Sequence, residues 1–553
     1  MPAHMATELP PLIQALLSAA RQAQAANVVL HETHGAWVLL AGEHAYKIKK
    51  PVKLAFMDFS TLALRRAACL AELTVNRRFE QPAPHPPLYI DVLPIVGTPD
   101  APLWGQPTDD NQAALEYAVH MRRFDDGLTL DHLCSHTHGP SPGPTQTDLV
   151  TNRPTLTARH LTDFAADLAR IQRQAAVAKP DGPYGHAAHV LAQALANVHA
   201  LQAQNLPAAH QTDLTWLANW TTQQHQRLAP LMTQRLMDGR VREGHGDLHL
   251  GNLALIDGTV QAFDAIEFND QFRWTDVASE IAFTWMDLQH HGQPGLANVF
   301  LSAWLDATGD AQATDVLPFF AVYRAMVRAK VSGIRLAQQS ADAEVQTAPQ
   351  PTTDPSTHVA TLATLAALAD VQRHIRMARQ LAEPAAPALV ITHGLSGSGK
   401  TWASERWLAT DASGRAIRLR SDIERQHMPP AQLQPGTGNP PSRYDPAARA
   451  AVYHHMAQRA AHLLENGWRV LVDATFLHTV DRNTFADVAR QAGVPFFILA
   501  CEAPPDTLRA RILHRQQTGH DASEATLDVL AQQLAVVEPL TPGERAVCLA
   551  LPG

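Results

Sequence analysis

The feature that most constrains this chain is a glycine-rich segment, residues 394–401, that matches the pattern G-x-x-x-x-G-K-[ST]. Its members are Gly394, Leu395, Ser396, Gly397, Ser398, Gly399, Lys400 and Thr401. The apolar run 388–392 before it predicts a buried parallel strand, and residues 402–408 predict a helix. A loop in this position turns successive backbone N–H groups toward phosphate oxygens. Part of the chain is therefore predicted to bind a nucleoside triphosphate.

Residues suited to bind phosphate, Mg²⁺ or an acceptor lie in this loop and after it in the sequence. Lys400 is predicted to reach the β- and γ-phosphates, and the Thr401 hydroxyl to ligate Mg²⁺. After a second predicted strand, 416–419, the pattern D-x-x-R places Asp422 to face an acceptor hydroxyl and Arg425, one helical turn later, to bind an acceptor anion. The alternative is a helix-capping aspartate followed by a surface arginine.

Two further strands are expected in this half, at residues 468–475 and 496–500. Asp473 ends the first of them, in the position of an acid that tunes Mg²⁺. A helix carrying Arg509, Arg511 and Arg515 then leads into the polar segment 517–523. Arginines beside a polar loop suit a lid that stabilises phosphate charge, although they are also compatible with an ordinary charged helix surface.

A chain of 553 residues should hold more than one core, because single cores stop growing near about 250–300 residues. Its 46% hydrophobic and 18% charged residues describe an ordinary globular protein. No apolar run is long enough to cross a bilayer, and four scattered cysteines suit a reducing compartment. We therefore expect a cytoplasmic protein without a membrane partner. The net charge of -9 disfavours general nucleic-acid binding.

The N-terminal half begins with three β-rich runs, 28–34, 36–41 and 44–49, separated by glycines, which predict successive antiparallel hairpins. Lys47 lies in the third run, and the predicted helix 59–79 that follows carries Glu72. A meander with a lysine on its third strand and a glutamate on the next helix matches the order of parts in a kinase N-lobe.

A second pattern follows nearly 200 residues later in the chain. The spacing H-x-D-x-x-x-x-N, from His245 through Asp247 to Asn252, is that of a kinase catalytic loop. Asp264 follows an apolar hairpin predicted at 253–263, where the metal-binding aspartate of a kinase lies. The rival interpretation, a surface loop rich in His and Asp, must explain all of these residues in the correct order.

Residues 245–249, His-Gly-Asp-Leu-His, together with Asn252, resemble the signature of the aminoglycoside phosphotransferase family, which has a protein-kinase-like fold. The resemblance extends over roughly residues 25–340. It implies the following roles: Lys47 on the α/β-phosphates, Glu72 as its partner, Asp247 as catalytic base, Asn252 and Asp264 as Mg²⁺ ligands, and Asp276 as a brace for the catalytic loop. Lys49 lies on the same strand face as Lys47, so the choice of phosphate lysine stays open.

The other half resembles small P-loop kinases, in particular the polynucleotide-kinase-like and gluconate-kinase-like groups, over about residues 388–553. The tandem order is similar to that of a group of bacterial two-domain proteins with an N-terminal aminoglycoside phosphotransferase-like domain and a C-terminal P-loop kinase domain of the AAA, zeta-toxin and polynucleotide-kinase type. The first half departs from protein kinases in two places, since it lacks a G-x-G-x-x-G loop and has Asp-Ala-Ile after the hairpin rather than Asp-Phe-Gly.

These features together predict two domains. An α+β protein-kinase-like fold is expected in residues 1–340, and an α/β P-loop NTPase with a parallel sheet in residues 388–553. Residues 341–387 are expected to hold a flexible segment, a helix and a linker, with the flexible stretch at 339–358. Arg324, Arg328 and Lys330, on a predicted helix near the end of the first domain, are expected to form a solvated face or internal salt bridges. The alternative is a basic helix face near an anionic substrate.

The predicted function is an ATP-dependent phosphotransferase with two ATP·Mg²⁺ sites that act on hydroxyl acceptors. The acceptor would be a small molecule in the first half, and a small molecule or a nucleic-acid 5′-hydroxyl in the second. The alternative is a regulatory or sensor protein that binds ATP and in which one half is not catalytic. The sequence identifies neither acceptor and predicts no oligomeric state.

Overall fold

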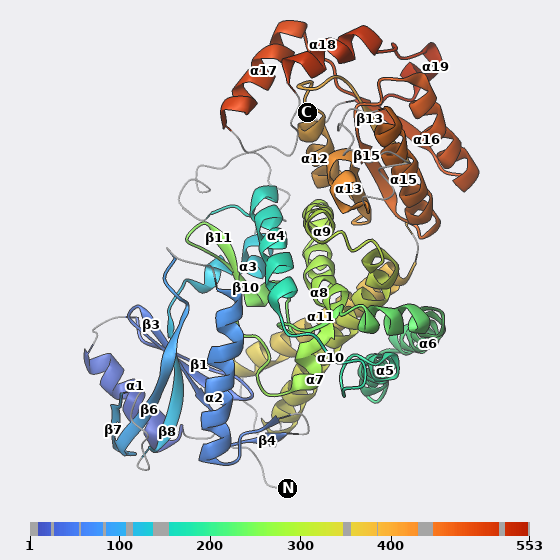
Figure 1. Ribbon diagram of the computed structural model, residues 1–553. Helices are drawn as coiled ribbons and strands as arrows, with labels where there is room; N and C mark the ends of the chain where they lie inside the picture. Colours follow the sequence, from blue (N-terminus) through green and yellow to red (C-terminus); the bar gives the residue numbers. More distant parts are fainter. Residues whose placement is uncertain are drawn as a thin grey trace. The chain divides into compact units, whose positions relative to one another are not determined.

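The computed structural model forms two compact units and describes residues 9–23, 27–54, 57–80, 85–106, 114–135, 154–346, 355–383, 385–429, 446–518 and 526–550 (Figure 1). The first unit comprises Met1–Leu156, Arg170–His291 and Phe319–Arg379. The second comprises Thr157–Ala169, Gly292–Pro318 and Gln380–Gly553. The predicted division into domains at 341–387 stays a prediction.

The first unit begins with a six-stranded sheet of strand order β1-β2-β3-β8-β6-β7, in which all neighbouring strands are antiparallel. Its strands are β1 (Val29–Glu32), β2 (Ala36–Ala41), β3 (His44–Lys49), β6 (Tyr89–Thr98), β7 (Ala101–Trp104) and β8 (Glu116–Arg122). The predicted opening meander is confirmed. β8 lies between β3 and β6, so the strand that leads into the helical part is central to the sheet.

Helices cover both faces of this sheet. α1 (Pro11–Ala23) packs its apolar side on a cluster that includes Ala118, whereas α2 (Leu62–Asn76) packs on a cluster that includes Tyr117 and Val119. Side chains alternate between the faces of a strand, so these neighbours on β8 point in opposite directions. The predicted helix with Glu72 is therefore fixed against the face that carries Tyr117.

The rest of the first unit is mainly helical (Figure 1). It contains the hairpin of β10 (Leu253–Ile256) with β11 (Thr259–Ala262), the pair of β9 (Val241–Glu243) with β12 (Trp274–Asp276), the small pair of β4 (Lys53–Leu54) with β5 (Met57–Asp58), and the helices α3 (Leu130–Ser135), α5 (Ala187–Gln202), α6 (Ala208–Met237), α7 (Asp270–Arg273) and α8 (Val277–His290). Every residue of α8 from Val277 to Leu288 is buried, so α8 is the central helix of this part.

Three long helices have residues assigned to each of the two units: α4 (Ala158–Gln174), α10 (Ala313–Gln346) and α11 (Pro355–Ala382). Of the stretch predicted to be flexible, residues 339–346 and 355–358 are helical, and residues 347–354 lie outside the described residues. The stretch is rich in Ala and Gln, which favour helices as strongly as they favour polar linkers. Within the described residues, no helix has both the length and the apolar character that spanning a membrane requires.

The second unit is built on a four-stranded parallel sheet of strand order β14-β15-β13-β16. Its strands are β13 (Leu389–His393), β14 (Ala416–Arg420), β15 (Arg469–Asp473) and β16 (Phe496–Ala500), and its helices are α12 (Lys400–Thr410), α13 (Ser421–His427), α15 (Pro446–Glu465), α16 (Thr479–Ala492), α17 (Pro505–Thr518), α18 (Leu527–Val536) and α19 (Pro542–Ala546). All the predicted strands are confirmed. Because β13 and β15 are neighbours, their carboxyl ends bring residues 394–401 beside Asp473.

Helix α9 (Pro294–Thr308) covers the edge strand of this sheet. The side chain of Asn298 accepts a hydrogen bond from Ala416 N at 3.0 Å and donates to Leu408 O at 3.2 Å. Ser302 Oγ accepts from Arg418 N at 3.2 Å. Unpaired backbone groups on an edge strand need such partners, so these polar residues of α9 complete the second unit.

Candidate active sites

In the first unit, a lysine on β3 joins three segments of the chain. Lys47 Nζ lies 2.8 Å from Oε1 of Glu72 on α2, and it also forms an ion pair with Asp264, which follows β11. Glu72 is completely buried, and a buried carboxylate requires a charged or hydrogen-bonding partner. The strand, the helix and the segment after the hairpin, which the sequence predicted to act together, therefore meet at one point.

The neighbouring Lys49 lies deeper. It is 2% exposed and forms ion pairs with Glu72 and with Glu267, a residue that the sequence analysis did not single out. Burial lowers the pKa of Lys47, but Asp264, Glu72 and Glu267 outweigh it and raise that pKa well above its usual value. The pKa of Lys49 is also raised, because Glu267 and Glu72 oppose the effect of burial. Both lysines are therefore charged.

The backbone at Asp264 is shaped by residues from distant parts of the chain. Asp264 has a φ of 60°, in the left-handed region that few residues other than glycine adopt. Its N–H donates to Tyr89 Oη at 2.9 Å, and the N–H of Ala265 donates to Asn76 Oδ1 at 2.9 Å. These contacts hold the carboxylate of Asp264 toward Lys47. Tyr89 and Asn76 carry no motif signal in the sequence.

Side-chain hydrogen bonds connect residues within the predicted catalytic loop. Asn252 Nδ2 donates to Asp247 O at 2.9 Å and to Asp247 Oδ2 at 3.3 Å. His249 Nε2 lies 3.5 Å from the same carboxylate oxygen. His245 Nε2 donates to Phe263 O at 2.9 Å, and its Nδ1 accepts from Asp247 N at 3.3 Å. Burial lowers the pKa of His245, which favours the neutral ring that these two bonds require.

Asp247 remains ionised in this loop. Burial alone would raise the pKa of its carboxyl group, but the neighbouring His249, Arg328 and His245 lower that pKa well below its usual value. Asp264 also has a lowered pKa, because Lys47 outweighs the effect of burial. Charged carboxylates and an amide oxygen form the kind of oxygen donor set that Mg²⁺ prefers. The predicted ligands Asn252 and Asp264 therefore carry the kinds of oxygen donor that Mg²⁺ binds, while Asp247 stays the predicted base.

Asp276 does not brace the loop as predicted. Its carboxylate accepts two hydrogen bonds from Arg235, both at 2.8 Å, and one from Ala278 N at 2.8 Å. The carboxylate of Asp276 therefore caps α8 and forms an ion pair with the fully buried guanidinium group of Arg235. The side chain of Asp276 thus secures the start of α8 rather than the loop.

Other residues hold the loop backbone instead. Thr284 Oγ1 donates to Leu248 O at 2.7 Å, and Asp287 Oδ2 accepts from Leu250 N at 2.8 Å. Arg324 is buried and donates to two backbone carbonyls, Gly246 O at 3.3 Å and Ser279 O at 3.2 Å.

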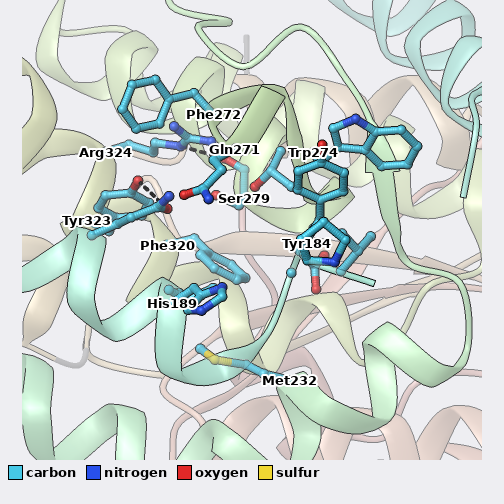
Figure 2. Close-up of a pocket in the computed structure, with 17 residues that line it drawn as sticks. Tyr184, His189, Met232, Gln271, Phe272, Trp274, Ser279, Phe320, Tyr323 and Arg324 are labelled. Carbon is cyan, nitrogen blue, oxygen red and sulfur yellow. Dashed lines mark hydrogen bonds between the residues drawn. The ribbon is translucent and has the colours of Figure 1, made fainter. Parts of the chain in front are cut away.

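Arg324 also lines a cavity of about 30 Å³, with Phe320, Tyr323, His189 and Tyr184 among the other lining residues (Figure 2). Its lining combines aromatic rings with the guanidinium group of Arg324.

In the second unit, glycines give the loop between β13 and α12 its shape. Gly397 and Gly399 have φ values of 82° and 95°, which side chains disfavour. A Cβ at Gly394 would lie 2.3 Å from Cys501 O. Ser398 Oγ is buried and has no hydrogen-bond partner within the described residues. A curled backbone with an unpaired buried hydroxyl fits the phosphate groups that this motif binds.

Several residues fix this loop to its surroundings. Lys400 Nζ donates to Leu395 O at 2.8 Å, and Arg511 Nη1 donates to Gly397 O at 3.2 Å. Ser396 N donates to Oε1 of Gln533 on α18 at 2.8 Å. Gln533 was not foreseen, because a single glutamine on a helix has no distinguishing pattern. Thr401 lies in the first turn of α12.

Asp473 lies at the carboxyl end of β15 next to this loop. Its Oδ2 accepts a hydrogen bond of 2.8 Å from Ser404, and the Ser404 hydroxyl accepts from Arg418 at 3.1 Å. The serine therefore links Asp473 to α12, one turn after the predicted metal ligand Thr401. Ser404 was not anticipated from the sequence.

Asp422 and Arg425 lie together on α13. Burial raises the pKa of Asp422, while Arg425 and Arg420 act to lower it. Asp473 and Lys400 also influence this carboxyl group, so Asp422 is electrostatically coupled to the loop. The capping alternative was wrong, because the N-cap of α13 is Arg420 and Asp422 lies within the helix.

The predicted arginine lid is described only in part. Arg511 reaches the glycine-rich loop, whereas Arg509 pairs with Asp506 on the helix surface at 3.2 Å. Arg515 belongs to α17, but its side chain lies outside the described residues, as do residues 519–525. The role of Arg515 stays a prediction.

Residues 389–540 match the family model of an AAA domain. Over 529 residues, the chain is 25% identical to an uncharacterised protein of Mycobacterium tuberculosis, a match that covers 94% of this chain and 93% of that protein. A counterpart in Mycobacterium bovis gives the same values of 25%, 94% and 93%. The resemblance to these relatives thus extends over both units.

Solved structures of kinases are similar to each half. The APS kinase of Mycobacterium tuberculosis in complex with AMPPNP and APS is 28% identical, covers 26% of this chain and 78% of its own, and has a TM-score of 0.21. A choline/ethanolamine kinase family protein from Mesorhizobium loti is 10% identical, covers 66% of this chain and 99% of its own, and has a TM-score of 0.33. The antiparallel sheet followed by helices in the first unit agrees with the predicted protein-kinase-like fold, and the parallel sheet of the second unit, with its family match, agrees with the predicted P-loop kinase fold.

The two lysines of β3 can be separated by matched substitutions. Lys47→Met should weaken ATP use by roughly 10-fold or more, because a charge-assisted contact to phosphate is lost, while Glu72 keeps Lys49 as a partner. Lys49→Met leaves Glu267 buried without its lysine and should cost about 3–5 kcal/mol of stability. Steady-state kinetics with ATP and thermal unfolding measure the two effects. The reverse pattern would make Lys49 the phosphate lysine.

Proposed function

We propose that this chain is an ATP-dependent phosphotransferase with two ATP·Mg²⁺ sites, each of which transfers a γ-phosphoryl group to a hydroxyl acceptor. The observation that carries the proposal for the first unit is the network in which Lys47 contacts both Glu72 and Asp264. Asp247 and Asn252, the other catalytic candidates, are hydrogen-bonded to each other in the same unit. The glycine-rich loop with Lys400 supports the second site.

In the first unit, Lys47 would bind the α- and β-phosphates, with Glu72 fixing the position of its ammonium group. Asp247 is ionised and, as the predicted base, would orient the acceptor hydroxyl by accepting its hydrogen bond. Asn252 holds the Asp247 carboxylate by a hydrogen bond of 3.3 Å, and its amide oxygen would ligate Mg²⁺ together with Asp264. Mg²⁺ would neutralise charge that develops on the transferred phosphoryl group.

In the second unit, the backbone of the glycine-rich loop and Lys400 would bind the phosphates, and Thr401 and Asp473 would hold Mg²⁺. Asp422 would orient the acceptor hydroxyl. The raised pKa of Asp422 makes its carboxylate a better proton acceptor than an exposed aspartate. Arg425 would bind an anionic group of the acceptor, and Arg511 would stabilise phosphate charge from α17.

An acceptor screen with the full-length protein tests this proposal. ADP release from ATP·Mg²⁺ is measured with sugars, amino alcohols, nucleosides and 5′-hydroxyl oligonucleotides, and products are identified by mass spectrometry. We expect at least one compound with a hydroxyl group to stimulate ADP release and to gain phosphate. Tight ATP binding in both units without transfer to any acceptor or to water would favour a nucleotide sensor instead.

A further inference from the structure

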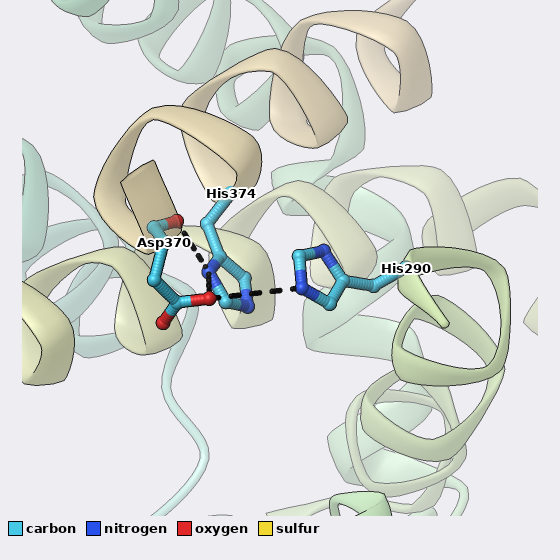
Figure 3. Close-up of side chains that lie close together, drawn as sticks. All are labelled: His290, Asp370 and His374. Atoms are coloured by element: carbon cyan, nitrogen blue, oxygen red, sulfur yellow. Dashed lines mark hydrogen bonds and ion pairs between the residues drawn. The ribbon is translucent and has the colours of Figure 1, made fainter. Parts of the chain in front are cut away.

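Three side chains of the first unit that the proposed function does not use lie close together. His290 lies at the end of α8, and Asp370 and His374 lie on α11 (Figure 3). One potential ligand atom from each residue lies within 4.8 Å of the other two. Asp370 and His374 are four residues apart, so they share one face of α11. In Figure 3, the carboxylate of Asp370 lies beside the ring of His374, and the ring of His290 lies on the other side of that ring.

The orientation of His374 is set by the backbone. Its Nδ1 lies 2.9 Å from Asp370 O, and a carbonyl oxygen only accepts, so Nδ1 carries the proton and Nε2 carries the lone pair. His374 is 2% exposed, and Nε2 has no hydrogen-bond partner within the described residues. A buried acceptor left unpaired costs about 1–3 kcal/mol. Histidines that bind metals show this arrangement, with one ring nitrogen on a carbonyl and the other on the ion.

His290 supplies a second neutral imidazole. Its Nε2 lies 3.9 Å from Asp370 Oδ1, and its ring stacks on that of His374 with centroids 4.0 Å apart. Burial, assisted by His374, lowers the pKa of His290 to about 4, and burial also lowers the pKa of His374. Both rings are therefore uncharged at neutral pH, which is the form that binds metal ions.

We propose that His290, Asp370 and His374 form a site for a divalent transition metal such as Zn²⁺. Two imidazoles and one carboxylate are a donor set typical of this class of ion, with the remaining position taken by water. Ligand atoms around tetrahedral Zn²⁺ are separated by about 3.4 Å, as follows from metal–ligand distances of about 2.0–2.2 Å. The His290 and Asp370 atoms are 3.9 Å apart and the three ligand atoms lie within 4.8 Å of one another, so the side chains must rotate, and the stacked rings must turn, to bind one ion.

Neighbouring cations compete with a metal at this site. Arg373 donates to Asp370 Oδ1 at 2.9 Å, but its side chain is 55% exposed and can turn into solvent. Ser332 holds the other oxygen of Asp370, which leaves Oδ1 for the ion. The charge of Asp287 acts on His374, and the smaller effect of Arg328 opposes it. Asp370 is 26% exposed, so an ion can enter from solvent.

The position of this site relates it to the catalytic loop. Asp287, one turn before the end of α8, accepts the hydrogen bond from Leu250 of the loop. A metal bound by His290 on α8 and by α11 would tie the two helices together and fix the helix that positions the loop.

Metal analysis of the full-length protein tests the proposal. The protein is equilibrated with Zn²⁺ in the presence of excess Mg²⁺, which keeps the predicted magnesium sites filled, and bound zinc is measured by mass spectrometry after dialysis. We expect about one Zn²⁺ per chain, and loss of this ion in His290→Gln and Asp370→Asn. His199→Gln, at an exposed histidine of the same unit, should retain it.

Two further measurements make the result independent of folding defects. Co²⁺ should give the visible absorption of a site with nitrogen ligands in the wild type but not in His374→Gln. Zn²⁺ should raise the Tm of the wild type and of His199→Gln only, because it binds the folded state. Absence of zinc from the wild type, or equal zinc content in His290→Gln and Asp370→Asn, would overturn the proposal.

Discussion

Asp247→Asn is expected to lower phosphoryl transfer by the first unit by about 10²–10⁴-fold, the usual contribution of a positioned general base. The amide keeps the size of the side chain and can still bond to Asn252, but it cannot accept the proton of the acceptor hydroxyl. The fold should be retained, so the loss should appear in kcat while the Tm changes little. The measurement is acceptor-dependent ADP release with a compound found in the screen.

The matched control is Asp238→Asn, at an exposed aspartate that ends α6 and bonds to Gln234. It should keep full activity. The Asp247→Asn variant should also keep all the activity that belongs to the second unit. Unchanged turnover in Asp247→Asn with every acceptor would remove the catalytic assignment of the first unit.

Lys400→Ala is expected to lower phosphoryl transfer by the second unit by roughly 10²–10³-fold, which is typical when one group that stabilises developing charge is removed. Lys400 Nζ is held over the loop by Leu395 O at 2.8 Å, so its charge is already close to the position of the phosphates. Acceptor-dependent ADP release is measured again, this time with an acceptor that Asp247→Asn still phosphorylates.

Lys179→Ala is the matched control, because it removes an exposed lysine of the first unit. A double variant with Asp247→Asn and Lys400→Ala should lose both activities. If Lys400→Ala abolishes the same acceptor-dependent activity as Asp247→Asn, the chain has one catalytic site that the other unit controls, and the proposal of two independent activities fails.

Short sequence patterns predicted parts of this structure because they reflect what the backbone requires locally. The glycines at 397 and 399 adopt φ values of 82° and 95°, and few other residues tolerate these values. Apolar runs of strand length predicted β13 to β16 for a similar reason, since a central parallel strand is buried on both faces. The order in which Asp247, Asn252 and Asp264 occur predicted a kinase-like loop.

Contacts between distant segments could not be derived in the same way. Lys47 and Asp264 are 217 residues apart, and Glu267, Tyr89 and Asn76 belong to no motif. The choice between Lys47 and Lys49 depends on how deeply each side chain is buried. The alternation of side chains along a strand puts both residues on one face and does not distinguish their burial.

Sequence alone determined the phosphate-binding loop, the parallel strands and the kinase-like catalytic pattern of this protein, because each depends on residues close together in the chain. The tertiary structure decided which residues support them. It placed Glu267 on Lys49, Gln533 on the glycine-rich loop and His290 beside Asp370. The physical reason is that a charge or a polar group is buried only with a partner, and folding brings that partner from any part of the chain.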